Sequence, residues 1–446
     1  MQPSETIFAL SSGRGRAGVA VIRISGPAAG SVLDAMAAPR PQPRYAAFRK
    51  ITSPSTGERL DDALALWFPA PRSETGEDIA ELQVHGGSAV IRAVLDGIAA
   101  IPGCRLAEPG EFVRRAFANG RLDLTAVEGL ADLIDAETEA QRRQAVVQAS
   151  GVAGRTYDGW RRRLVDACAL VEAAIDFSDE PDVAADALMQ GRAQAAALAD
   201  ELRASLRDSH RGEIIREGLR VVLTGPPNVG KSSLLNALAE REVAIVSPEA
   251  GTTRDVIEVR LDIGGYVVVL TDTAGLRTAV GPIEAEGMRR TREEAGRADL
   301  IVWLVDATDP VAEVPADLAA MSADRLVVLN KIDLVPQAPQ TAPDVIALSA
   351  TTGEGLDGLI GRLQGFVRHH LGGTDPAPSL VTRARHRQLL ERADAALRRC
   401  LADDRAPAEL QAEDLREAAD ALAQIIGLID VEDVLGQIFG RFCIGK

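Results

Sequence analysis

A turn with the spacing of a phosphate-binding loop lies near the middle of the chain, at residues 225–232. It reads Gly-Pro-Pro-Asn-Val-Gly-Lys-Ser and fits the pattern GxxxxGK followed by Ser or Thr. The glycines allow backbone N–H groups to approach a phosphate, and a helix that starts here adds partial positive charge. Lys231 is placed to reach the β- and γ-phosphates and act in catalysis, and Ser232 to reach Mg²⁺. The predicted contacts with a nucleoside triphosphate are Asn228, Val229, Gly230, Lys231, Ser232 and Ser233.

A second motif, DTAG, follows the apolar strand expected at 267–270. A carboxylate at the end of such a strand faces the same phosphates, so Asp272 is expected to hold Mg²⁺ through a water of the metal's shell. Between the two motifs, the segment GTTRD can bring the Thr253 hydroxyl to the metal if it forms a mobile loop. An ordinary surface turn is the alternative interpretation of GTTRD. Further expected nucleotide contacts are Thr252, Thr253, Asp272, Thr273, Ala274 and Gly275.

A third motif, Asn330-Lys331-Ile332-Asp333, follows the expected strand RLVVLN and indicates which base is bound. A carboxylate can accept two hydrogens, from the ring N–H and the exocyclic amine of guanine, and adenine does not offer that pair. A base that lacks these hydrogens would leave polar groups of the site without partners, and this strongly lowers its affinity. Ser349 and Ala350, after the next strand, complete the expected pocket. The sequence therefore predicts a guanine-nucleotide site.

The composition indicates a multidomain globular protein. The 446 residues are 46% hydrophobic and 26% charged, and such a length suggests three domains. The net charge of −16 argues against nonspecific coating of nucleic acid. It leaves room for a local basic patch, since residues 1–60 carry eight Lys or Arg against three Asp or Glu.

The four cysteines include no CxxC pair, so the sequence suggests neither a zinc site nor a disulfide framework. It contains no apolar run of membrane-spanning length and no signal-peptide pattern at its start, and the expected location is the cytoplasm.

The pattern of apolar and polar residues changes at three points along the chain. Alternating apolar runs with helix-like stretches predict an α+β domain over 1–118, and helical spacing follows over 119–214. β-Branched runs alternating with helices predict a mainly parallel α/β domain over 215–374. A Gly/Pro linker, LGGTDPAPSL, precedes renewed helical texture over 375–446, which ends in CIGK. An α/β domain thus interrupts a helical domain whose two halves must pack together.

These motifs resemble the TrmE-Era-EngA-like P-loop GTPases, and further stretches narrow the resemblance to the MnmE (TrmE) family of tRNA-modification GTPases. The resemblance runs essentially from end to end. Its most specific stretches are GRGRAGVAVIRISG, TGEDIAELQVHGG, EPGEFVRRAFANGRLDL, GLADLIDAET, VEAAIDF, PPNVGKSSLLNAL, AGTTRD, DTAGLR and FCIGK.

The resemblance implies the fold, the reaction and the partners. It implies an N-terminal domain that binds a reduced folate (5-formyl- or methylene-tetrahydrofolate) and dimerises, a discontinuous helical domain and an inserted G domain. It also implies a homodimer that acts with MnmG in a heterotetrameric complex, the partner alone carrying FAD. The implied reaction adds an aminomethyl or carboxymethylaminomethyl group, from a folate-derived one-carbon unit, at C5 of wobble uridine 34 of certain tRNAs.

The resemblance also implies how hydrolysis is catalysed. Leu276 follows DTAG where Ras-like enzymes carry a water-orienting glutamine. Relatives use K⁺ in place of an arginine finger, and Glu284 matches their water-positioning glutamate, although the neighbouring Glu286 stays open as an alternative. The residues that match the K⁺ site are Asn228, Ser247, Glu249 and Thr252, of which Ser247 and Thr252 are also expected to contact the nucleotide.

For the folate, the resemblance implies Arg23, Glu81, Arg121 and Lys446. On a strand, Glu81 shares a face with Gln83 and His85, which makes a polar face there credible from spacing alone. Arg121 stands where many relatives have Lys, and the geometry of a guanidinium differs from that of an ammonium. Cys443 is either a nucleophile or a packed thiol.

Two other functions are alternatives to this interpretation. A ribosome-assembly GTPase switch of the Era type usually carries an RNA-binding appendage after the G domain, and no GXXG-loop domain follows residue 372. A membrane-remodelling GTPase requires an amphipathic or transmembrane anchor, and the sequence shows no evident one.

Overall fold

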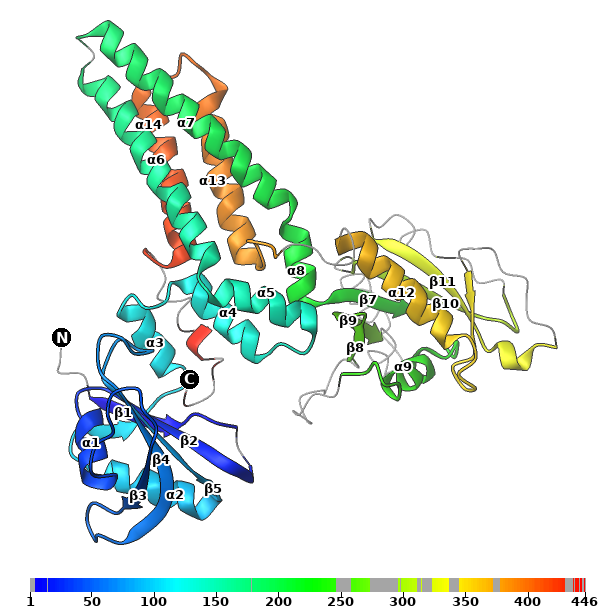
Figure 1. Ribbon diagram of the computed structural model, residues 1–446. Helices are drawn as coiled ribbons and strands as arrows, with labels where there is room; N and C mark the ends of the chain where they lie inside the picture. Colours follow the sequence, from blue (N-terminus) through cyan, green and yellow to red (C-terminus); the bar gives the residue numbers. More distant parts are fainter. Residues whose placement is uncertain are drawn as a thin grey trace, which may run out of the picture. The chain divides into compact units, whose positions relative to one another are not determined.

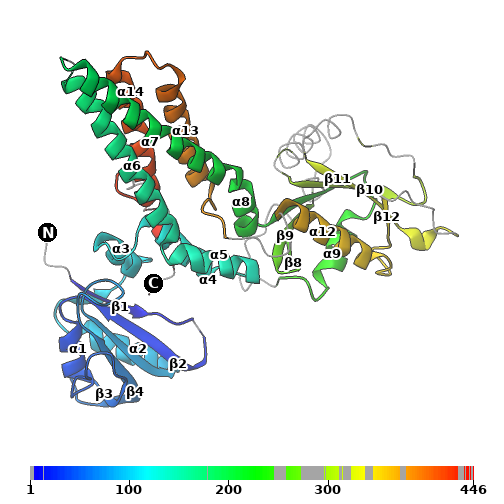
Figure 2. The same cartoon turned by 45° about the horizontal axis from the view of Figure 1, so that its top comes forward.

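The computed structural model describes residues 5–13, 15–177, 179–245, 258–272, 296, 298–310, 314, 323–336, 345–371, 378–429, 436, 438–440, 442 and 445. Contacts divide the chain into two units, whose elements Figures 1 and 2 label. The first comprises Met1–Ala131, Gln148–Ala199 and Arg392–Lys446, and the second Asp132–Val147 and Asp200–Glu391. Both units therefore combine segments that are far apart in the sequence.

Six strands of the first unit form one sheet in the order β3-β4-β5-β2-β1-β6. Neighbouring strands pair antiparallel, except β1 and β6, which run parallel. The strands are β1 (Thr6–Leu10), β2 (Ala17–Ser25), β3 (Ala47–Thr52), β4 (Arg59–Phe68), β5 (Ile79–Gly86) and β6 (Cys104–Leu106).

One face of this sheet packs on two helices, α1 (Ala29–Met36) and α2 (Ser88–Ala99). On β2, Ile22 and Ile24 are buried against them, whereas Arg23 between them is half-buried. Successive side chains of a strand point to opposite faces, so Arg23 belongs to the face away from the helices. The predicted α+β character of this region is confirmed.

Helix α3 (Glu111–Ala118) is held to the sheet by a buried carboxylate. Glu111 is 2% exposed and accepts hydrogen bonds from Arg105 at 2.6 and 2.8 Å, from Arg115 at 3.2 Å and from the Glu108 N–H at 2.9 Å. Burial alone would raise the pKa of Glu111, but these bonds outweigh it and lower the pKa to about 2.

Helices from before and after the inserted α/β domain pack together in the first unit. Arg192 of α7 donates hydrogen bonds to the carbonyls of Cys400 and Leu401, at 2.9 and 3.1 Å, and to the Gln411 side chain at 2.9 Å. The discontinuous helical domain is therefore confirmed. Its long helices are α6 (Val152–Asp176), α7 (Pro181–Arg207), α13 (Ala384–Ala402) and α14 (Ala408–Ile426).

The second unit contains the predicted α/β fold, with a sheet in the order β12-β11-β10-β7-β9-β8. The strands run parallel apart from the β8–β9 hairpin, and their apolar side chains form a core with α9 and α12. The elements are β7 (Leu219–Thr224), α9 (Lys231–Ala239), β8 (Glu258–Ile263), β9 (Tyr266–Asp272), β10 (Leu300–Asp306), β11 (Asp324–Asn330), η2 (Ile332–Leu334), β12 (Val345–Ala347) and α12 (Leu356–Leu371).

Helical residues of the same unit contact the chain just before the α/β fold begins and just after it ends. Gln144 exchanges two hydrogen bonds with the backbone of Ser379, at 2.7 and 2.9 Å, just after the sheet's last helix. Asp132 pairs with Arg216, just before β7, at 3.0 Å, and with Arg383 at 2.7 Å. The helices that supply these groups are α4 (Leu124–Ile134), α5 (Glu139–Ala149) and α8 (Ser209–Glu217).

These contacts explain why the second unit includes residues 132–147 and 200–218. The predicted domain boundaries at 118, 214 and 374 stay predictions. Among the helices that the structure describes, none combines the length and the apolar character required to cross a membrane.

The buried carboxylate of Glu111 should make the N-terminal sheet acid-sensitive. Its folded pKa lies below the ordinary value of 4.5, so the stabilisation is complete above about pH 4.5 and is lost as the pH falls toward 2. We expect Glu111→Gln to reduce stability at pH 7 by about 3 kcal/mol, because it breaks a buried ion pair. Amide hydrogen exchange in β1 and β6 measures this locally.

Glu172→Gln is the matched control, because the half-exposed Glu172 side chain pairs with Arg416 at 2.8 Å in the same unit. Solvent screens that pair, and exchange in β1 and β6 should stay as in the unaltered chain. Equal exchange rates for the Glu111→Gln variant and the unaltered chain at pH 7 would show that the buried pair does not stabilise the sheet.

Candidate functional site

The predicted phosphate-binding turn joins β7 to α9, and its shape requires glycine at two positions. Gly225 and Gly230 have φ angles of 150° and 96°. A Cβ on Gly225 would lie 2.5 Å from the Leu304 carbonyl oxygen, and one on Gly230 would lie 2.3 Å from Nδ2 of Asn330. The turn therefore packs its backbone directly against the neighbouring strands β10 and β11.

The charged and hydroxyl side chains of the turn come together at the carboxyl end of the sheet. Lys231 is 6% exposed, and its Nζ donates to the carbonyls of Gly225 and Pro226, both at 2.9 Å. The Ser232 hydroxyl donates to Oδ2 of Asp272 at 2.8 Å, and Asp272 is fully buried. Two hard oxygen donors this close match the preference of Mg²⁺, which takes its remaining ligands from water and phosphate.

Asn330 connects three segments of the site. It is 1% exposed, its Nδ2 donates to the Val229 carbonyl at 2.8 Å, and its Oδ1 accepts from the Ala350 N–H at 3.0 Å. Ser349 is buried, and its hydroxyl accepts from the Thr352 N–H at 3.1 Å. Asn330 thus holds the phosphate turn and the segment after β12 in one arrangement, beside η2, which carries the exposed Asp333.

One further residue at this edge, Asp306, belongs to none of the predicted motifs. Asp306 ends β10, and its Oδ2 pairs with Nζ of Lys331 at 2.6 Å. Its Oδ1 accepts from the N–H and hydroxyl of Thr308 at 2.9 and 2.7 Å. Burial opposes ionisation, but the bonds from Lys331 and Thr308 outweigh it and lower the pKa of Asp306. The available signal was an acidic residue ending the apolar run LIVWLVD.

Other predicted residues of this site lie outside the described residues, so their roles stay predictions. They are Ser247, Glu249, Thr252, Thr253, Thr273, Ala274, Gly275, Leu276, Glu284 and Glu286. Among the residues that the structure describes, no group of three or more His, Cys, Asp or Glu side chains is arranged to hold a metal ion.

Two of the predicted folate residues form an ion pair on the open face of the N-terminal sheet. Arg23 and Glu81 are register partners on β2 and β5, with Nε and Oε1 3.1 Å apart. Arg23 also pairs with Glu74 at 2.6 Å. Arg121 lies against Gly76, where a Cβ would be 3.3 Å from its Cγ. Lys446 and Cys443 lie outside the described residues, and next to them the Gly445 carbonyl accepts from the Ser11 hydroxyl at 2.7 Å.

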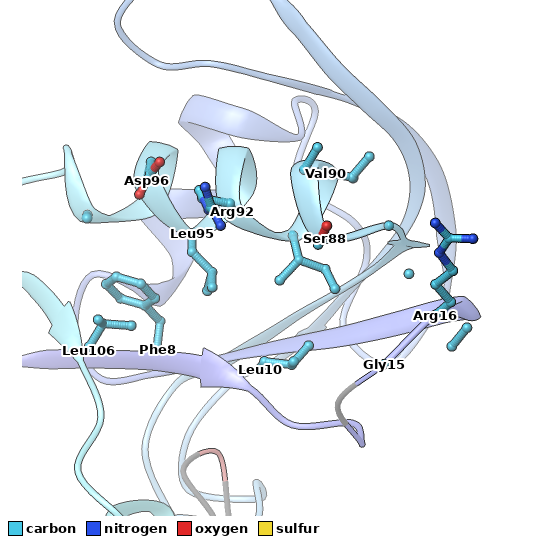
Figure 3. A pocket seen from close by; sticks show the side chains of 16 residues that line it. Phe8, Leu10, Gly15, Arg16, Ser88, Val90, Arg92, Leu95, Asp96 and Leu106 are labelled. Carbon is cyan, nitrogen blue, oxygen red and sulfur yellow. The ribbon is translucent and has the colours of Figure 1, made fainter.

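The helix-covered side of the same sheet contains a cavity of about 940 Å³, between α2 and β1 (Figure 3). Its walls are mainly apolar, with Phe8, Leu10, Leu95 and Leu106 among them, and Arg16 stands at one end. Of the predicted folate residues that the structure describes, Arg23, Glu81 and Arg121, none lines it. The cavity and the Arg23–Glu81 pair are thus two separate features.

Comparison with known proteins gives matches along the whole chain. Residues 6–121 match the family described as "GTP-binding protein TrmE N-terminus", and residues 124–443 match "MnmE helical domain". A protein of Rhodopseudomonas palustris, named tRNA modification GTPase MnmE, is 50% identical over 450 residues, covering 100% of both chains. A protein of the same name from Methylorubrum populi is 53% identical over 446 residues, covering 99% of this chain and 98% of that one.

The Asp306–Lys331 pair should contribute to nucleotide affinity by orienting Lys331 beside the predicted base pocket. We expect Asp306→Asn, which preserves the shape but removes the charge, to weaken GDP binding about twofold to fivefold, the range for partly exposed ion pairs. Because the pKa of Asp306 is lowered, the carboxylate stays ionised and the difference persists across neutral pH. Titration with a fluorescent GDP analogue measures the affinity.

Asp309→Asn serves as the control, because Asp309 is exposed three residues further on and outside the pair. It should bind GDP like the unaltered chain. Equal GDP affinities of the Asp306→Asn and Asp309→Asn variants would show that the Asp306–Lys331 pair does not position Lys331 for the base.

Proposed function

The chain belongs to the MnmE (TrmE) family of tRNA modification GTPases, and from this we propose that it binds and hydrolyses GTP in the course of modifying tRNA. The observation that carries the proposal is the meeting of three segments at one sheet edge. The phosphate turn, the buried Asp272 and the Asn330 segment all converge there, and Asn330 is hydrogen-bonded to two of the loops.

Each group at this edge has a task in the proposed reaction. The N–H groups of the turn and the Lys231 ammonium bind the β- and γ-phosphates and stabilise the charge that develops there. Ser232 and Thr253 would hold Mg²⁺, with Asp272 acting through a water of the metal's shell, and the bound ion would neutralise phosphate charge. Asp333 accepts the two guanine hydrogens, and Ser349 and Ala350 close the pocket beside the base.

We further propose that hydrolysis is stimulated by K⁺, held by Asn228, Ser247, Glu249 and Thr252 as the G domains of a homodimer meet. A cation between the β- and γ-phosphates has the electrostatic role of an arginine finger. Glu284 positions water, with Glu286 as the alternative. Of these K⁺ residues, Asn228 is the one that the structure describes, and it lies in the phosphate loop with a φ of 62°.

The proposed modification uses a reduced folate as ligand and one-carbon donor. Arg23, Glu81, Arg121 and Lys446 are the proposed contacts, and MnmG is the partner that brings FAD. The Glu81 carboxylate is suited to a pterin, whose ring N–H and amino group form a donor pair like that of guanine. The product is uridine 34 carrying an aminomethyl or carboxymethylaminomethyl group at C5. The proposed location is the cytoplasm, where that tRNA is found.

The similarity along the whole chain to proteins named tRNA modification GTPase MnmE disfavours the alternative of an Era-type ribosome-assembly switch.

The decisive experiment is nucleoside analysis of tRNA from cells that lack this protein. We expect the C5-modified wobble uridine to disappear and to return when the gene is restored. Restoration with Lys231→Ala should fail, because that variant loses the phosphate-binding cation. Unchanged nucleosides together with immature ribosomal subunits would favour the ribosome-assembly function instead.

The K⁺ proposal predicts a salt effect on the full chain. GTP hydrolysis with Mg²⁺ should be at least tenfold faster in KCl than in NaCl of equal ionic strength, because only a cation of suitable size and hydration replaces the arginine finger. The release of inorganic phosphate measures the rate. Equal rates in the two salts would exclude K⁺ stimulation and leave the nucleotide site itself unaffected.

A further inference from the structure

Two aromatic side chains stand out at the edge of the N-terminal sheet. Tyr45 is 69% exposed and Phe48 is 68% exposed, although aromatic residues make up only 3% of the chain. Phe48 lies on β3, the outermost strand of the sheet, directly opposite Leu64 of β4, which is itself 39% exposed. Folding therefore leaves apolar ring surface in water, which is costly unless a partner covers it.

Cations are frequent in the same stretch of chain as these rings. No acidic residue occurs between Asp34 and Glu58, whereas that stretch holds Arg40, Arg44 and the Arg49-Lys50 pair. Arg40 is compensated, since it pairs with Asp34. We call the residues Arg44, Tyr45, Phe48, Arg49, Lys50 and Arg72 the β3 edge patch, in which Lys50 is the register partner of Asp62 on β4.

Two guanidinium groups of the β3 edge patch are held in place by neutral acceptors. Arg49 donates to the carbonyls of Pro39 and Phe48, at 2.7 and 2.9 Å. Arg44 donates to the carbonyl of Arg72, and its Cζ lies 5.9 Å from the centre of the Phe68 ring. These bonds orient the side chains but do not neutralise their charge. Two positioned positive charges therefore belong to residues next in sequence to the two exposed rings, Arg44 to Tyr45 and Arg49 to Phe48, on a protein whose net charge is −16.

Exposed rings with oriented cations are the features that bind unpaired nucleotides. Bases stack on aromatic faces whatever their identity, and cations contact the phosphates. Bases in a duplex are already stacked, so such a patch suits a loop or an end of an RNA rather than a stem. A two-fold contact with a second copy would instead place the cations of both copies in one interface.

We propose that the β3 edge patch is a docking surface for an unpaired segment of tRNA. Tyr45 and Phe48 stack on bases, and Arg44 and Arg49 contact phosphates. The inference rests on the proposed function, which makes tRNA the substrate, and adds where that substrate touches the protein. It requires no contribution from the guanine-nucleotide site.

Binding of a fluorescein-labelled tRNA transcript with uridine at position 34 tests the surface, with full-length chain and fluorescence anisotropy. We expect the double variant Tyr45→Ala and Phe48→Ala to raise the Kd at least tenfold, with its salt dependence unchanged. The double variant Arg44→Gln and Arg49→Gln should also raise the Kd, and should flatten the slope of log Kd against log salt by about 1.4, for two phosphates of a single strand.

Two controls match these changes elsewhere in the same unit. Phe177→Ala removes another half-exposed aromatic ring, and Arg405→Gln removes another exposed cation. Both should bind tRNA like the unaltered chain. The patch variants should keep their GTP hydrolysis rate and their molar mass by light scattering, since the altered residues lie outside the nucleotide site and none belongs to the buried core.

Three results would overturn the proposal: tRNA affinity unchanged in both patch variants, no tRNA binding by the unaltered chain, or a patch variant whose molar mass falls while its tRNA affinity holds. The last result would make the patch a contact between protein chains.

Nucleoside analysis separates this inference from the proposed function: a patch variant that fully restores the modified uridine in deletion cells refutes only the docking surface.

Discussion

One buried amide, that of Asn330, fixes the arrangement on which the nucleotide site depends. Its donor end holds the carbonyl of Val229 in the phosphate turn, and its acceptor end holds the N–H of Ala350. A side chain in this position needs both partners, because an unsatisfied buried polar group is costly. The same amide lies so close to Gly230 that no other residue fits there. The phosphate turn and the segment of the proposed base pocket are thus linked by one hydrogen-bonded group.

Helical residues form ion pairs and hydrogen bonds with the two segments that flank the inserted α/β fold. Asp132 accepts from Arg216 before β7 and from Arg383 after α12, and Gln144 holds the backbone of Ser379. Helical residues that precede the insertion in sequence thus contact both of its flanks. A movement of the sheet relative to either flank would strain these bonds.

Charge is distributed unevenly over this acidic protein. In the N-terminal domain, Glu111 binds Arg105 and Arg115 where the sheet meets α3, and Arg23 binds Glu81 on the open face. At the sheet's edge, in contrast, Arg44 and Arg49 are satisfied by carbonyl oxygens and keep their net charge. The partly buried cations are paired with carboxylates, whereas the cations at the edge stay available to an anionic partner.

The amino-acid sequence alone determined the features that depend on short spacing. The GxxxxGK turn, the Asn330 to Asp333 motif and the period-two strands are local patterns, and they predicted the α+β domain, the interrupted helical domain and the parallel α/β sheet. The predicted contacts at Asn228, Lys231, Ser232, Asp272 and Ser349 rest on the same kind of pattern.

Only the tertiary structure decided which distant residues meet. Asp306 belongs to no motif, and it reaches Lys331 because β10 pairs with β11 in the register that sets Asp306 opposite Asn330. The exposure of Phe48 likewise follows from the place of β3 at the edge of its sheet. Strand order is set by packing between segments far apart in the chain, and no local spacing of residues specifies it.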